Sequence, residues 1–159
     1  MTETTAVDNR YTRGIARFVA GLRYEDLPQD VRHRAKLLIL DALGSGLYAA
    51  DLQWSRLLRD TLLDVDQTRT CAVWGTHERL SSVHATLCNG TQVQGFELDD
   101  VHREAVMHPG SVSIPPVIAI AETHPGMAGR DLLTSVVAGY EIGPRVGVCM
   151  GRNPLEQGW

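Results

Sequence analysis

Apolar residues recur at helical intervals along most of this chain, and the pattern predicts a mostly helical protein. The clearest example follows Pro28, which suits the first position of a helix, and Asp30, an acid that suits its positive amino-terminal end. We therefore expect a helix from about residue 28 to residue 43. Its apolar positions are Val31, Ala35, Leu38, Ile39, Ala42 and Leu43.

Further helices are expected wherever the same periodicity returns. Ser81 is a suitable N-cap for one of them. Pro115 and Pro116 fall in the first turns of another, where a proline removes few backbone hydrogen bonds. Residues 70–74 form a β-prone run that Gly75 closes, and we interpret it as a lone edge strand. The fold class is therefore expected to be all-α, with that short strand as the exception. The further helical segments are residues 15–22, 52–62, 82–96, 111–123 and 130–150.

Small residues line the last of these helices. Gly139, Gly143 and Gly147 stand at successive i+4 positions, so they share one face and allow a neighbouring backbone to come close. Pro144 is expected to kink the helix. The glycines lack the lysine and hydroxyl residue of a phosphate-binding loop, so we assign them to packing. Asn89-Gly90 could form a hairpin turn, but its helical surroundings favour a buried asparagine within a helix.

The composition is typical of a soluble globular protein. The 159 residues carry a net charge of −4 and are 43% apolar, which suffices for one sizeable core and one domain. The charges are scattered, so no nucleic-acid partner is expected. The longest apolar runs, Leu37–Leu40 and Ile114–Ala121, are far shorter than the ~20 residues of a membrane-spanning helix. The start MTETTAVDNR lacks the apolar core of a signal peptide. We therefore expect a cytoplasmic protein with no membrane partner.

Acids and histidines concentrate between two expected helices, in the segment FELDDVHREAVMHPGS at residues 96–111. An acid and an imidazole in one crevice can divide general acid and base work, because histidine titrates near neutral pH and the acid orients it. The structural alternatives are that the aspartate pair forms a solvated turn and that a lone histidine only packs. The residues concerned are Glu97, Asp99, Asp100, His102, Glu104 and His108.

The end of this segment stands where a helix is expected to begin. His108-Pro109-Gly110-Ser111 would then present free backbone N–H groups and the positive end of the helix to an anion. A substrate carboxylate is the expected occupant.

A metal site is another interpretation of the same segment. Its acids and histidines could bind iron, manganese or zinc, although their spacing fits no specific metal motif. The cysteines are odd in number and widely spaced, so we expect neither a disulfide framework nor a thiolate zinc site, and we assign them to packing. The candidate ligands are Asp99, Asp100, His102 and His108, and the cysteines are Cys71, Cys88 and Cys149.

The string CNGTQVQGFELDDVHREAVMHPGSVSIPPVIAIAE, residues 88–122, resembles the MmgE/PrpD family. Members of that family carry an NG pair, an acid-rich DD segment and an HPS-like turn before an apolar helix. The later stretch GRDLLTSVVAGYEIGPRVG supports the likeness. The resemblance implies a large helical domain, a smaller α+β lid later in the chain and a homodimer. It also implies lyase or isomerase chemistry on small polycarboxylates, such as 2-methylcitrate dehydration or cis-aconitate decarboxylation, without a metal or organic cofactor.

The resemblance further implies roles for individual residues. His108 matches the active-site histidine of the family and is the first candidate for proton transfer. Glu97 and Asp100 are the other catalytic candidates, expected to orient the imidazole. Glu97 stands where relatives often have aspartate, Val101 where threonine is common and Gly110 where serine is usual. The substrate-binding candidates are Asp99, Gly110, Ser111 and His102.

Length is the largest departure from the family pattern. Gly158-Trp159 resembles the point just before a second active-site histidine. Residues 1–159 are therefore expected to form one partial helical domain, without the lid and its basic residues, that is inactive by itself. The leading hypothesis is the amino-terminal fragment of a lyase or isomerase for di- or tricarboxylates. The alternatives are a noncatalytic helical module, one half of a split enzyme with a complementary chain, and a metal-dependent hydrolase. Uncovered helix faces predict an oligomer.

Overall fold

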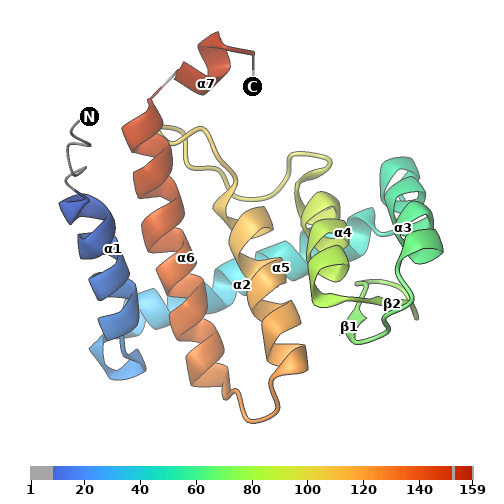
Figure 1. The fold of residues 1–159 in the computed structure, drawn as a ribbon, viewed down its shortest axis with the longest axis horizontal. Coiled ribbons are helices and arrows are strands. Elements are labelled where there is room, and N and C mark those ends of the chain that lie inside the picture. Colours follow the sequence, from blue (N-terminus) through green and yellow to red (C-terminus); the bar gives the residue numbers. More distant parts are fainter. Residues whose placement is uncertain (1–8, 152, 159) are drawn as a thin grey trace, which may run out of the picture.

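The computed structural model describes residues 9–151 and 153–158, and within them the protein is mostly helical, as predicted (Figure 1). No helix in these residues is long and apolar enough to cross a membrane. The elements are α1 (Arg10–Gly21), a 3-10 turn η1 (Tyr24–Asp26), α2 (Gln29–Ala49), α3 (Gln53–Val65), β1 (Cys71–Ala72), β2 (Arg79–Leu80), α4 (Ser82–Gln94), α5 (Pro109–Thr123), α6 (Gly129–Met150) and the short α7 (Asn153–Glu156).

Helix α2 crosses behind α4, α5 and α6 and packs against all three (Figure 1). It can do so because its inner face consists of small residues, among them Ala42 and Gly46, both of which are buried. A Cβ added at Gly46 would lie 2.7 Å from the ring of Trp74, so this contact requires glycine. The core at the crossing consists of Ala42, Trp74, Val93, Ile114 and Val136.

The β-prone run at residues 70–74 is not a lone edge strand, and that prediction is wrong. β1 pairs antiparallel with β2, with Cys71 opposite Leu80 and Ala72 opposite Arg79. The partner strand has only two residues, which is too short for apolar alternation to reveal it. The hairpin is held to α4 by Asn89, whose side chain accepts from the Trp74 N–H and donates to the Ala72 carbonyl, both at 3.0 Å. The prediction of a buried asparagine within a helix is confirmed.

Asp66, just after α3, joins that helix to the hairpin and to α4. Its carboxylate accepts from the backbone N–H groups of Thr68 and Ser81, both at 2.8 Å, and contacts Nδ1 of His84 at 2.8 Å. The hydrogen bonds from Ser81 are the main reason why the pKa of Asp66 lies well below its usual range. Ser81 also caps α4, as predicted, because its hydroxyl oxygen accepts from the backbone N–H of His84 at 3.4 Å.

The glycines of α6 receive close neighbours, as predicted. A Cβ at Gly139 would lie 2.8 Å from the Ser113 hydroxyl on α5, and one at Gly147 would lie 2.7 Å from the Ala105 carbonyl oxygen. Gly143 faces the methyl group of Met107. Helix α6 is assigned without a break through Pro144. Its glycine face therefore holds both α5 and the loop that precedes α5.

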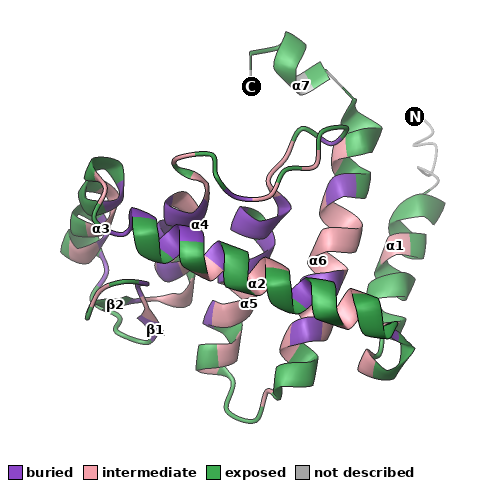
Figure 2. Ribbon diagram, turned by 180° about the vertical axis from the view of Figure 1, so that it is seen from behind, coloured by how far each residue is buried: buried purple, intermediate pink, exposed green. Residues whose placement is uncertain are grey.

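Apolar side chains stay exposed on several helices, α1 and α2 among them. Helix α1 has no buried residue, and on the outer face of α2 Leu40, Leu47 and Tyr48 are exposed (Figure 2). Exposed apolar groups of this kind favour association. Oligomer formation stays a prediction.

Candidate active site

The candidate site lies in the loop between α4 and α5. Two of its residues, Glu97 and Val106, have the positive φ angles of 59° and 49° that side chains other than glycine rarely adopt. Within the same loop, His102 and Met107 form an antiparallel bridge: the His102 N–H donates to the Met107 carbonyl at 2.9 Å. The loop therefore folds back on itself and is a fixed structure that can place side chains.

His108 and Asp99 meet at this loop. Nδ1 of the imidazole lies 3.0 Å from Oδ1 of the carboxylate, at ion-pair distance but without the alignment of a good hydrogen bond. The Asp99 side chain is 0% exposed and the His108 side chain 19% exposed. Burial raises the pKa of Asp99, and the charge of His108 opposes that rise. The imidazole therefore favours the charged form of Asp99, in a place that keeps most water away.

Asp100 turns to the start of α5 instead. Its Oδ1 accepts the Gly110 N–H at 2.9 Å, so it occupies one of the free amides at the helix start. In this structure Asp100 thus takes an amide at which a substrate carboxylate was expected, and binding of a substrate at the helix start stays a prediction. Gly110 is needed here, because an added Cβ would lie 2.5 Å from Asp100 Oδ1. Ser111 points its hydroxyl back to the His108 carbonyl at 2.9 Å.

Tyr140 approaches the same turn from α6. Its hydroxyl oxygen is buried, has no hydrogen-bond partner and would lie 3.0 Å from a Cβ at Gly110. Burial raises the pKa of Tyr140, and the charge of Asp100 raises it further. In the sequence, Tyr140 shares the inward face of the helix predicted at residues 130–150 with Val136 and Val137, and a phenol among such apolar positions is a signal that could have marked it.

Glu97 and His102 lie apart from this group. The Glu97 side chain is exposed and accepts from the Gln94 amide at 3.3 Å. His102 accepts the Ala105 N–H at its Nδ1 and is half-buried. Among the described residues, the carboxylate in contact with His108 is therefore that of Asp99 and not that of Glu97.

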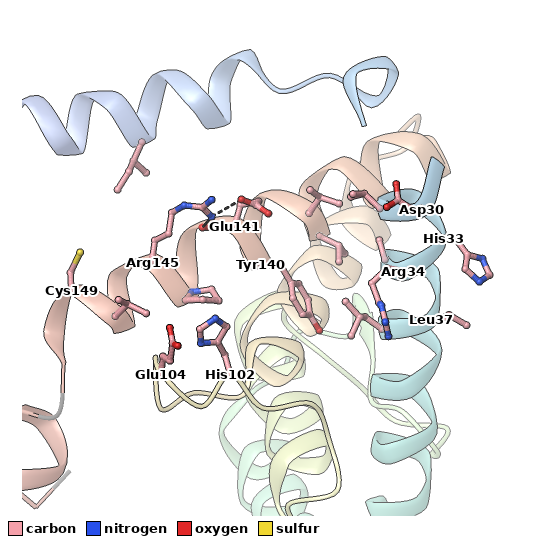
Figure 3. A pocket seen from close by; sticks show the side chains of 18 of the residues that line it. Asp30, His33, Arg34, Leu37, His102, Glu104, Tyr140, Glu141, Arg145 and Cys149 are labelled. Carbon is pink, nitrogen blue, oxygen red and sulfur yellow. Dashed lines mark hydrogen bonds and ion pairs between the residues drawn. The ribbon is translucent and has the colours of Figure 1, made fainter. Parts of the chain in front are cut away.

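His102 instead borders a cavity of about 1220 Å³ between α1, α2 and α6. Figure 3 shows His102 and Glu104 reaching from the loop toward the part of α6 that carries Arg145. The lining is largely apolar, and it includes Tyr140 but not His108, Asp99 or Asp100. In the part of the chain that the structure describes, no group of three or more metal-ligating side chains is placed to hold a metal ion.

The fold and the site together define a mostly helical protein with a buried carboxylate beside a histidine at the start of a helix. The family model for the MmgE/PrpD N-terminal domain matches residues 13–159. The chain belongs to the MmgE/PrpD family, and the resemblance found in its sequence is confirmed.

Three curated relatives are similar to it. The cis-aconitate decarboxylase-like protein oryM of Aspergillus oryzae is 35% identical over 100% of this chain and 34% of its own length. The cis-aconitate decarboxylase of Aspergillus terreus is 33% identical over 100% of this chain and 34% of its own length. The cis-aconitate decarboxylase of Homo sapiens is 28% identical over 85% of this chain and 29% of its own length. The chain spans about a third of the length of the curated relatives it matches.

Proposed function

We propose that this chain is the amino-terminal part of a lyase for small di- or tricarboxylates, in which His108 transfers a proton. The observation that carries the proposal is the 3.0 Å contact between His108 and the buried Asp99. The names of the relatives favour decarboxylation of cis-aconitate over the dehydration of 2-methylcitrate or an epimerisation.

In this proposal the proton moves as follows. Decarboxylation breaks the bond between a carbon and its carboxylate, carbon dioxide leaves, and the electron pair stays on the carbon. The protonated imidazole of His108 donates its proton to that carbon and is later reprotonated by solvent. Asp99 stabilises the imidazolium through its negative charge. Asp99 thus takes the role that the sequence assigned to Glu97 or Asp100.

The substrate carboxylates and the developing negative charge need positive groups. Asp99 and Asp100 are acidic, and Arg103, the arginine of this loop, is exposed to solvent. We propose that the cations come from the rest of the family protein, about two thirds of the length of the relatives, either in the same polypeptide or in a complementary chain. The described third then supplies the proton-transfer pair.

Two measurements test the proposal. In the full-length Aspergillus terreus relative, alanine at the position aligned with His108 should lower kcat by ~10²-fold or more, the scale of lost acid–base catalysis. Alanine at the position aligned with His77, an exposed residue of the hairpin, is the control. In this chain, the imidazole NMR signals of His108 should move on addition of cis-aconitate. Unchanged turnover in the first variant would refute the proton-transfer role.

A second candidate is a noncatalytic helical module that binds a complementary chain. The exposed apolar residues of α1 and α2 favour it. Its test is the sedimentation of the isolated chain: a dimer or larger species fits the module, and a compact monomer contradicts it.

A further inference from the structure

Tyr140 is a buried polar group that the proposed proton transfer does not use. Its neighbours on the inner face of α6, Val136 and Val137, are apolar and buried, and its own ring lines the cavity beside α2. Its hydroxyl end is closed off from solvent and lies by Gly110, at the start of α5. A phenylalanine would fill the same space, so packing alone does not require the hydroxyl.

The Asp100 carboxylate lies on the same side of Gly110 as this hydroxyl. A Cβ placed on Gly110 would lie 2.5 Å from Oδ1 of Asp100 and 3.0 Å from the Tyr140 oxygen, so both oxygens face the same small space. Oδ1 already accepts the Gly110 N–H, while the hydroxyl has no partner in the structure. The Tyr140 hydroxyl is therefore a donor without an acceptor, and it lies beside the Asp100 carboxylate, which can accept further hydrogen bonds.

We propose that Tyr140 is a positioning residue whose hydroxyl donates to Asp100 and thereby holds the His108–Gly110 turn in place. This inference rests on the proposed function, because it assigns Tyr140 to the turn that carries His108. The raised pKa of Tyr140 keeps the phenol protonated, so it remains a donor across the range in which histidine titrates. Tyr140 acts on the turn only through Asp100 and is not itself a catalytic residue.

The absence of a side chain at Gly110 makes this arrangement possible. A Cβ would occupy the space in which the carboxylate and the phenol approach each other. The resemblance noted from the sequence implies serine at this position in relatives. We infer that Gly110 and Tyr140 work as a pair in this chain.

Amide hydrogen exchange in the 159-residue chain tests the proposal without any need for turnover. Tyr140→Phe retains the ring and removes only the hydroxyl. It should speed exchange of the Gly110 N–H by about tenfold or more, the factor expected for weakening a hydrogen bond to a charged acceptor. Tyr48→Phe is the matched control, since Tyr48 is 70% exposed and far along α2.

The Trp74 N–H, which donates to Asn89, is the internal reference for a general loss of stability. Its exchange rate should stay unchanged in Tyr140→Phe. A separate measurement uses the Asp100→Asn variant. The Tyr140 hydroxyl proton should shift in the NMR spectrum of Asp100→Asn. If the Gly110 and Trp74 amides exchange faster by the same factor, or if neither exchanges faster, Tyr140 only packs and the inference is overturned. That outcome leaves the proton-transfer role of His108 standing, because the turnover test of His108 is independent of it.

Discussion

Replacing Gly110 with alanine is the sharpest test of how the start of α5 is built. The new methyl group would lie 2.5 Å from Asp100 Oδ1 and 3.0 Å from the Tyr140 oxygen. Since real Cβ atoms do not come so close to an oxygen, the carboxylate must move, and moving it breaks its hydrogen bond with the Gly110 N–H. The substitution therefore removes a specific contact and does not merely fill space.

The magnitude follows from two opposing terms. A hydrogen bond to a charged acceptor contributes roughly 1.5–3 kcal/mol. Alanine is better than glycine in a helix by about 1 kcal/mol, which offsets part of that loss. We expect Gly110→Ala to lower the free energy of unfolding by about 0.5–2 kcal/mol, or to lower Tm by roughly 2–6 °C for a chain of this size.

Gly44 provides the matched control, because it also lies in a helix but a Cβ there would meet nothing within 4 Å. Gly44→Ala should raise stability by about 0.5–1 kcal/mol. Urea unfolding followed by far-UV circular dichroism near neutral pH measures both variants. If Gly110→Ala is as stable as Gly44→Ala, the Asp100 contact does not hold the helix start, and the reasoning fails.

Two further predictions concern the pH dependence of stability. Burial raises the pKa of Asp99, so the folded state binds its proton more tightly than the unfolded state, and stability should fall as pH rises from the ordinary value of 3.8 through the raised value. In this chain, Asp99→Asn should remove that pH dependence and increase stability near neutral pH. The same change in the full-length relative should abolish turnover. A less stable Asp99→Asn variant would contradict the raised pKa of Asp99. Asp66 has the opposite sign: hydrogen bonds lower its pKa, so it stabilises the fold above the ordinary value of 3.8 and loses that effect as pH falls below it. Asp66→Asn should flatten the acid side of the stability curve, and an unchanged acid midpoint in a pH titration of unfolding would be evidence against this role.

The helices could be predicted because each buries an apolar stripe whose spacing is visible in the sequence. The start of α5 immediately after His108, the Ser81 cap and the glycine contacts of α6 all followed from local rules. The β-hairpin did not, since β2 has only two residues and β1 is held by the Asn89 side chain of α4. Contacts between segments far apart in the chain leave no periodic signal.

The roles of the neighbouring acids were harder to predict for a related reason. Asp99 and Asp100 are adjacent, yet one side chain is buried beside His108 and the other caps α5. Successive side chains in an extended loop point in different directions, and spacing does not say which one turns inward. The positive φ of Glu97 changes the course of the chain just before the pair, and nothing in a single sequence announces such an angle in a residue other than glycine.

The backbone of the loop, more than the attraction between the two side chains, sets how Asp99 and His108 lie relative to each other. The loop is closed by the bridge between His102 and Met107, and Ala105 rests on Gly147 of α6. These contacts lie between Asp99 and His108 in the chain and involve neither of their side chains. A buried carboxylate opposes folding unless a positive partner is near, so an isolated Asp99 would tend to turn outward. The loop opposes this by fixing the backbone between the two residues, so Asp99 stays beside His108 at a cost in stability.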